Sequence, residues 1–177
     1  MVDAGDSLTS LREAIAVAND TPGRDTVSFE PAVFSQPTVI ELSLGPLEIT
    51  DDLTIDGPGR GLLSIDAQGV SRVMQFVGAE GDLSLSGLTI TGGSSGAGEP
   101  GGGIHFQPPV GTLTLAGVTV TANTSAAGGG GIFSAGDTFI DQSEISDNHA
   151  DGGGGGIAST HSLWLAATTV TGNTSGS

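Results

Sequence analysis

A period of 25 residues in the C-terminal half of the chain constrains its fold more than any other feature of the sequence. Gly-Gly-Gly-Ile occurs at 101–104, 129–132 and 154–157. Three columns of similar residues recur at intervals of 25: Asn123, Asn148 and Asn173; Val120, Ile145 and Val170; Leu115, Ile140 and Leu165. A repeat of this length predicts a solenoid in which each repeat forms one coil.

Within each repeat, three short runs alternate between apolar and polar residues, as at 138–140, 144–146 and 156–158. Alternation with a period of two predicts strands, and the intervening glycines and polar residues suit tight turns. Three strands per coil, with coils stacked at about 4.8 Å, make a parallel β-helix. The expected inward positions, with their equivalents one coil on, are Leu113, Leu115, Val118, Val120 and Ile132.

The earlier part of the chain predicts further coils at less regular spacing. Alternating runs lie at 27–29, 39–42, 47–49, 53–55, 63–65, 73–77, 83–85 and 88–90. From Ile90 to Val120 the interval is 30 residues instead of 25, with two of the extra five in the loop 92–103 and three in 106–111. Such insertions form loops, which either build a binding face or are tolerated surface variation.

The Asn column has two interpretations. Asn tolerates left-handed backbone conformations and suits the turn after a strand, and stacked Asn amides bond to one another along a solenoid axis. The alternative is a binding stripe lined with Asn.

Residues 7–20 form the one helical pattern, and Pro22-Gly23 ends it. Ser10 and Glu13 fit a capping box. The expected apolar face, which would cover the open end of the solenoid core, consists of Leu8, Leu11, Ile15 and Ala18. We therefore divide the chain into a cap, 1–25, and β-helix coils, 26–177, which we expect to be truncated at the C-terminus because another Gly-Gly-Gly-Ile is due there.

The cap resembles a known family. Ser7-Leu-Thr-Ser-Leu-Arg-Glu-Ala-Ile-Ala-Val-Ala-Asn19, with 25–29 and Leu53-Thr-Ile-Asp-Gly-Pro-Gly59, is similar to the N-terminal cap of CSLREA-type bacterial β-helix proteins. Gly-Gly-Gly-Ile and Ile145-Ser-Asp-Asn148 resemble the GGAI and FxxN repeats of polymorphic outer membrane proteins. Thr9 replaces the family's Cys, and Val120 and Ile145 replace the FxxN aromatic. The resemblance implies an all-β, right-handed, pectate-lyase-like parallel β-helix that is secreted or displayed on a bacterial surface or outer membrane.

Composition limits the possible partners. The net charge is −16, with four arginines and no lysine, so phosphate-mediated nucleic-acid binding is not expected. No run of 18 apolar residues exists, so no membrane insertion is expected within this segment. Thirty-one glycines and 4% aromatic residues suit a narrow solenoid core better than a layered domain. The acidity indicates solubility in a salty environment or, alternatively, divalent-cation binding.

A search for catalytic residues yields no assignment. A β-helix lyase needs calcium-binding aspartates beside a basic Arg or Lys, and the nearest match in sequence comprises Asp51, Asp52, Asp56 and Asp66 with Arg60 and Arg72. Aspartates before a strand are also ordinary turn residues. The histidines, 44 and 12 residues apart, fall off the coil period and are expected to be solvated turn residues: His105, His149 and His161.

No cofactor is predicted. The glycine runs lack the Gly-Lys-Ser/Thr of a phosphate loop and the calcium nonapeptide pattern. Glu99 and Asp151 near these runs offer weak calcium binding at most.

One outward pattern suggests ice binding, because flat Thr-x-Thr arrays order water. The pairs are Thr89/Thr91, Thr119/Thr121 and Thr169/Thr171, interrupted by Glu144 and Ser146. Thr is also favoured on strand faces generally.

The leading hypothesis is a non-enzymatic secreted or cell-surface segment: a stalk, a passenger or an adhesin-like surface for extracellular glycans or surface proteins. The alternatives are a fragment of a polysaccharide lyase or hydrolase, with its catalytic coils beyond Ser177 or within 51–72, and an ice-binding face. Acidic residues stacked across coils beneath an Arg would favour the enzyme, whereas smooth faces of Thr, Ser and Asn would favour the stalk.

Overall fold

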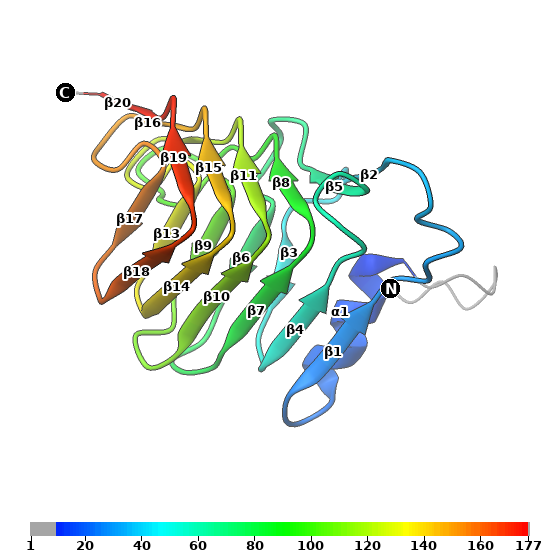
Figure 1. Cartoon of the computed structure of the whole chain (residues 1–177). Helices are drawn as coiled ribbons and strands as arrows, with labels where there is room; N and C mark the ends of the chain where they lie inside the picture. Colours follow the sequence, from blue (N-terminus) through cyan, green and yellow to red (C-terminus); the bar gives the residue numbers. More distant parts are fainter. Residues whose placement is uncertain (1–9, 177) are drawn as a thin grey trace.

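The computed structural model describes residues 10–176 and is a right-handed parallel β-helix with one helix, α1 (Leu11–Asp20), at its N-terminal end (Figure 1). Every strand pairing is parallel, and each strand pairs with its equivalents in the neighbouring coils. The predicted fold class is therefore confirmed.

Three long sheets run along the axis. Sheet A consists of β1 (Asp25–Ser28), β4 (Leu53–Asp56), β7 (Leu83–Ser86), β10 (Thr112–Ala116), β14 (Asp137–Asp141) and β18 (Leu163–Ala166). Sheet B consists of β2 (Thr38–Glu41), β5 (Leu63–Asp66), β8 (Thr89–Thr91), β11 (Thr119–Thr121), β15 (Glu144–Ser146) and β19 (Thr169–Thr171). Sheet C consists of β3 (Leu47–Ile49), β6 (Met74–Phe76), β9 (Ile104–Phe106), β13 (Ile132–Ser134) and β17 (Ile157–Ser159).

A fourth, short sheet follows sheet B in the last three coils and was not predicted. It contains β12 (Thr124–Ser125), β16 (His149–Ala150) and β20 (Thr174–Ser175). Two-residue strands are too short to show any alternation in sequence, so periodicity could not reveal them.

The register confirms the sequence columns and both insertions. Val120 pairs with Ile145 and Ile145 with Val170, at intervals of 25. One coil earlier the interval is 30 in sheet B (Ile90 with Val120) and 28 in sheet C (Ile104 with Ile132). The two extra residues before β9 and the three after it therefore lie at corners, outside the strand pairing.

The core consists of the inward side chains of sheets A, B and C. All five predicted inward residues have no solvent exposure: Leu113, Leu115, Val118, Val120 and Ile132. One coil on, Thr138 and Ser143 are also buried, and each has a hydrogen bond, from the Thr138 hydroxyl to the Gly136 carbonyl and from the Val118 amide to the Ser143 hydroxyl. Polar core residues are tolerated here because they have partners.

The Asn column forms a buried amide ladder. The Nδ2 of Asn123 donates to Oδ1 of Asn148, and the Nδ2 of Asn148 donates to Oδ1 of Asn173, each over 2.9 Å. The structural interpretation of the Asn column is thus confirmed, because the side-chain amides form the expected ladder. The left-handed conformation, however, belongs to the preceding residue, as in Ala122 and Asp147, both with φ of +54°.

The glycine triplets pack against this ladder, so two separate sequence signals form one unit. In the triplet 129–131, Gly129 has φ of +69°. A Cβ on Gly130 would collide with the His149 carbonyl of the short sheet, and one on Gly131 would lie 3.0 Å from the Asn148 amide carbon. Any larger residue would displace the corner that holds the amides.

The helix closes the N-terminal end as predicted. Leu11, Ile15 and Ala18 are buried in the core, whereas Leu8 lies outside the described residues. The predicted capping box is confirmed: Ser10 is the N-cap, its hydroxyl accepts from the Glu13 amide, and the Glu13 carboxylate accepts from the Ser10 amide. The described helix is too short and too polar to cross a membrane, and no other helix occurs in residues 10–176.

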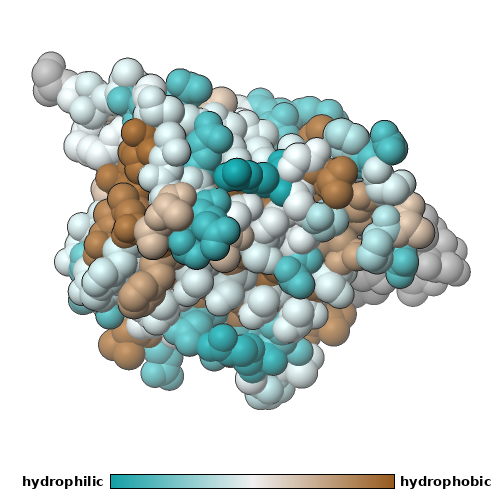
Figure 2. All heavy atoms as spheres, viewed as in Figure 1, coloured by the Kyte–Doolittle hydropathy of each residue, from teal (hydrophilic) through white to brown (hydrophobic). Residues whose placement is uncertain are grey.

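The opposite end carries exposed apolar residues. Leu163, Leu165 and Val170 occupy inward columns but are 39%, 46% and 48% exposed, because no further coil covers them in the structure. Figure 2 shows hydrophobic residues gathered on the left, over this last coil.

Candidate functional site

One groove crosses three coils at the corner between sheets C and A. It has a volume of about 540 Å³ and is lined by residues 50–52, 80–82 and 110–111. Four of the lining residues are acidic: Asp51, Asp52, Glu80 and Asp82. Carboxylates from two successive coils come together in this groove.

The three aspartates of the groove accept backbone hydrogen bonds. Oδ1 of Asp52 accepts from the Asp82 amide at 2.8 Å, and Oδ1 of Asp82 accepts from the Thr112 amide at 2.9 Å. Asp137 repeats the pattern with Ser162 at 3.3 Å. Asp52 and Asp82 precede a sheet A strand, and Asp137 is the first residue of one. Each accepts the amide at the equivalent position of the next coil, so this column extends the strand ladder by one bond.

Arg24 lies over two of the stacked aspartates. Its Nη2 is 2.7 Å from Oδ2 of Asp82 and 3.8 Å from Oδ2 of Asp52. Both oxygens of Asp51 are occupied as well, by the Gly23 and Asp52 amides. The arrangement of acidic residues beneath an Arg therefore exists, although its groups bond to one another and to the backbone.

Of the aspartates and arginines named from sequence, only Asp51 and Asp52 lie in this groove. Asp56 accepts from the Ser86 hydroxyl, and Asp66 accepts from the Gln68 amide at 2.7 Å. Arg60 donates to the Gln142 carbonyl. The predicted grouping within 51–72 is therefore distributed over several structural contacts.

Arg72 binds the inserted loop, residues 94–101. Its side chain is 12% exposed and its Nη2 lies 2.7 Å from Glu99, while its Nε donates to the Pro100 and Gly101 carbonyls. Asp151 lies 3.4 Å from His149. Glu99 and Asp151, the weak calcium candidates, thus both face a basic partner, and residues 10–176 contain no group of three or more His, Asp or Glu arranged to hold a metal ion.

Sequence reasoning missed Arg24 and Asp82 as neighbours of Asp52. One signal was present, since Asp52 and Asp82 are separated by 30 residues, as are Leu53 and Leu83, which pair in sheet A. Arg24 precedes β1, which pairs with β4. Applying the coil length to charged residues as well as apolar ones would have placed these three side chains together.

The prediction of solvated turn histidines is correct for His161, correct in exposure alone for His149, which lies in β16, and wrong for His105. His149 and His161 are exposed, and the three histidines do not stack. His105, however, is 5% exposed and lies in β9. Burial, with a further contribution from Arg72, lowers its pKa from 6.5 to about 4. The solvated-turn prediction failed because the inserted loop covers this strand.

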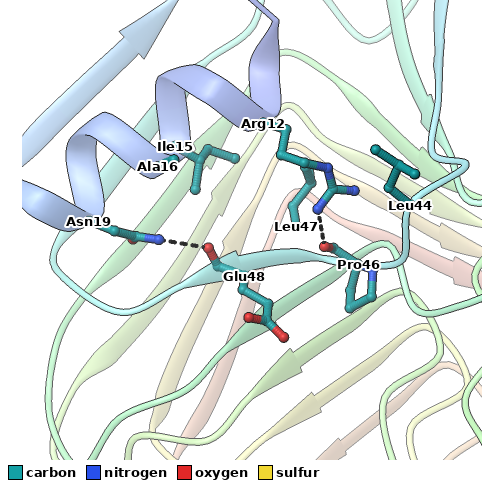
Figure 3. A pocket seen from close by; sticks show the side chains of 8 residues that line it. All are labelled: Arg12, Ile15, Ala16, Asn19, Leu44, Pro46, Leu47 and Glu48. Atoms are coloured by element: carbon teal, nitrogen blue, oxygen red, sulfur yellow. Dashed lines mark hydrogen bonds between the residues drawn. The ribbon is translucent and has the colours of Figure 1, made fainter. Parts of the chain in front are cut away.

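A second groove, of about 350 Å³, lies between α1 and β3 (Figure 3). Arg12 crosses it and donates to the Pro46 and Gly45 carbonyls, each over 2.6 Å. Asn19 donates to the Glu48 carbonyl and accepts from the Thr50 amide. These polar groups fix the helix to the free edge of β3, so the groove belongs to the cap.

The Thr-x-Thr pairs lie in register on the outer face of sheet B. The array is not uniform, because Glu144 and Ser146 interrupt it and the Thr89 hydroxyl donates to the Arg60 carbonyl. Sheet A presents a second outward column, with Thr54, Ser84 and Thr114 followed by the stacked rings of Phe139 and Trp164. Hydroxyl side chains thus predominate on two long faces.

Comparisons of the chain with protein-family models, with curated proteins and with solved structures gave no match.

Proposed function

We propose that this chain is a non-enzymatic segment of a secreted or cell-surface bacterial protein, in which stacked coils form a stalk, passenger or adhesive surface. Its partners would be extracellular glycans or surface proteins that follow the long axis of the solenoid. The resemblance of 7–19 to CSLREA-type caps, and of the repeats to those of polymorphic outer membrane proteins, supports display outside the cell.

The engagement of every cationic side chain carries this proposal. The chain has four arginines and no lysine. Arg12 holds the cap, Arg24 pairs with Asp82, Arg60 bonds to Gln142 and Arg72 holds the loop 94–101. A lyase needs a basic side chain that is free to approach the substrate, and a guanidinium committed to structural partners does not meet that need.

The outer faces support a binding role. Hydroxyl columns on sheets A and B run in register over several coils, and a stacked sheet holds such columns at a spacing of about 4.8 Å. An extended polymer can contact many equivalent positions on such a face, so that weak contacts add up.

The test compares binding with cleavage. Purified protein is applied to an array of bacterial and plant glycans, and separately incubated with uronic-acid polymers in calcium, with unsaturated product followed by absorbance. We expect retention on at least one extended glycan, or on a surface protein, without cleavage. Cleavage that disappears in Arg24→Ala or Arg72→Ala, while the fold persists by circular dichroism, would refute a non-enzymatic role.

The second candidate, a polysaccharide lyase or hydrolase, is favoured by one observation. Arg24 lies over Asp52 and Asp82, two of the aspartates that line the groove at the corner between sheets C and A. If it is correct, Asp82→Asn should abolish cleavage, whereas Asp137→Asn, at the same column outside the groove, should leave it unchanged.

A further inference from the structure

In the coil that carries the inserted loop 94–101, the outer face of sheet C is more deeply buried than in the neighbouring coils. In β9, His105 points outward between the inward Ile104 and Phe106, and all three are buried. The equivalent outward residues of the neighbouring strands, Gln75 and Phe133, are only partly buried. The coil that carries the inserted loop is therefore the one in which the outward residue of sheet C is buried.

The loop contacts both the histidine and a single arginine. A Cβ on Gly101, where the loop ends, would lie 2.9 Å from Cα and Cβ of His105, a contact with the following strand that Gly129 and Gly154 also make in the next two coils. Arg72 binds the loop through the Glu99 carboxylate and the Pro100 and Gly101 carbonyls. The contacts of Arg72 with the loop and the imidazole of His105 thus lie in the same small region.

One nitrogen of the imidazole has no hydrogen-bond acceptor. Its Nδ1 is buried without a hydrogen-bond partner, and on one side the ring packs edge-on against Phe133, with centroids 5.4 Å apart. A second proton would place an imidazolium beside the Arg72 guanidinium, with Glu99 as the one compensating carboxylate. A buried, uncompensated cation is strongly disfavoured.

We propose that protonation of His105 releases the loop 94–101 from sheet C, so that this corner of the solenoid opens in acid. Opening hydrates the imidazolium and separates it from Arg72. The released loop exposes the outward face of β9, where His105 is buried at neutral pH.

The other charged groups facing His105 are Arg72, from the turn before β6, and Glu99, from the loop itself. The strand neighbours Gln75 and Phe133 do not titrate. Glu99 is the competing trigger, because its protonation would weaken the Arg72 ion pair. The experiment must therefore separate the carboxylate from the imidazole.

The chain has no cysteine, so two dyes can be placed on Gly61→Cys and Gly96→Cys. Neither glycine has an atom within 4 Å of an added Cβ, and neither requires a left-handed φ. Single-molecule energy transfer between the dyes is followed from pH 7 to pH 3. Nanomolar concentration is used because a pI near 4.1 promotes association in this range.

We expect one state at pH 7 and a second, opened state that grows as the pH falls from 6.5 toward 4. The ratio of the two proton affinities allows the opening equilibrium to rise by up to about 300-fold. His105→Phe, and as a second variant His105→Gln, should stay closed throughout. His149→Phe, which replaces an exposed histidine, should behave like the unaltered chain.

Glu99→Gln separates the two triggers. If His105 is the trigger, this variant still opens as the pH falls, and at least as readily as the unaltered chain, because Glu99 is the carboxylate that favours the imidazolium in the closed state. A Glu99→Gln variant that is open at every pH, or a His105→Phe variant that opens like the unaltered chain, would assign the effect to the carboxylate and overturn the proposal. So would an unaltered chain that stays closed at pH 3.

Discussion

Replacement of Asn148 by Ala tests the most regular feature of the core. The Asn148 side chain has no solvent exposure and makes four hydrogen bonds. Its Nδ2 donates to the Val120 carbonyl and to Oδ1 of Asn173, both over 2.9 Å. Its Oδ1 accepts two hydrogen bonds from Asn123, one from the backbone amide at 3.0 Å and one from the side-chain Nδ2 at 2.9 Å.

The expected cost follows from these contacts. A typical intramolecular hydrogen bond contributes about 1 kcal/mol net, so four bonds give about 4 kcal/mol. The partners left behind are buried, and water cannot reach them without opening the corner, which places the loss toward the upper end of single-residue effects. Asn148→Ala should therefore lower the free energy of unfolding by about 4 kcal/mol.

Asn173→Ala is the matched control. Asn173 also makes four hydrogen bonds, but it belongs to the last coil and is only partly buried. Water can replace its lost bonds, so the expected cost is about 1 kcal/mol. The two variants thus share the same chemistry and differ in access to solvent.

Urea unfolding followed by circular dichroism measures both values, and an unchanged m-value confirms that the same surface unfolds. Amide exchange adds a local readout, because Asn148→Ala should speed exchange of the Asn123 amide at least tenfold. Equal losses in the two variants, or a loss below about 1 kcal/mol in Asn148→Ala, would show that the ladder adds little to stability.

Three further outcomes are expected. Because the pKa of His105 falls from 6.5 in the unfolded chain to about 4 in the folded one, the unfolded state binds the extra proton in this window. Stability should be complete above pH 6.5 and fall toward pH 4 by at most about 3 kcal/mol, and urea titrations of His105→Phe should lack this loss. Ala122→Gly should raise the melting temperature, with a gain of about 1 kcal/mol, because Ala122 has φ of +54°. The chain should self-associate at micromolar concentration through its last coil, and Leu165→Lys with Val170→Lys should restore the monomer in sedimentation velocity, whereas Val110→Lys, elsewhere on the surface, should not.

Sequence periodicity was sufficient for the coil length, the inward residues and the cap, because each reflects a repeating requirement for burial. Leu113, Leu115 and Val120 must face a core that recurs with every coil, and the spacing records it. The 30-residue coil was also readable, since its two insertions displace otherwise aligned residues.

The candidate site was less predictable because its contacts are specific to single coils. Arg24 meets Asp82 across 58 residues, and no other coil has an equivalent pair among the described ion pairs. In the sequence, His105 alternates with apolar residues as an outward strand residue does, which predicts exposure. Its burial is apparent only in the folded structure. Periodicity describes what coils share, so it could not locate features that distinguish one coil from the next.

The two insertions at corners show that the fold preserves the alignment of strands between coils and not a constant number of residues per coil. Strand pairing restores alignment after β9 although the coil is five residues longer than its successor, 30 against 25. Extra residues at a corner therefore do not shift the strand pairing of the following coils. One extra residue within a strand, by contrast, would turn the remaining side chains of that strand to the opposite face. Gly96, with open space around it, is consequently a position at which foreign peptides could be displayed without disturbing the lattice of strands.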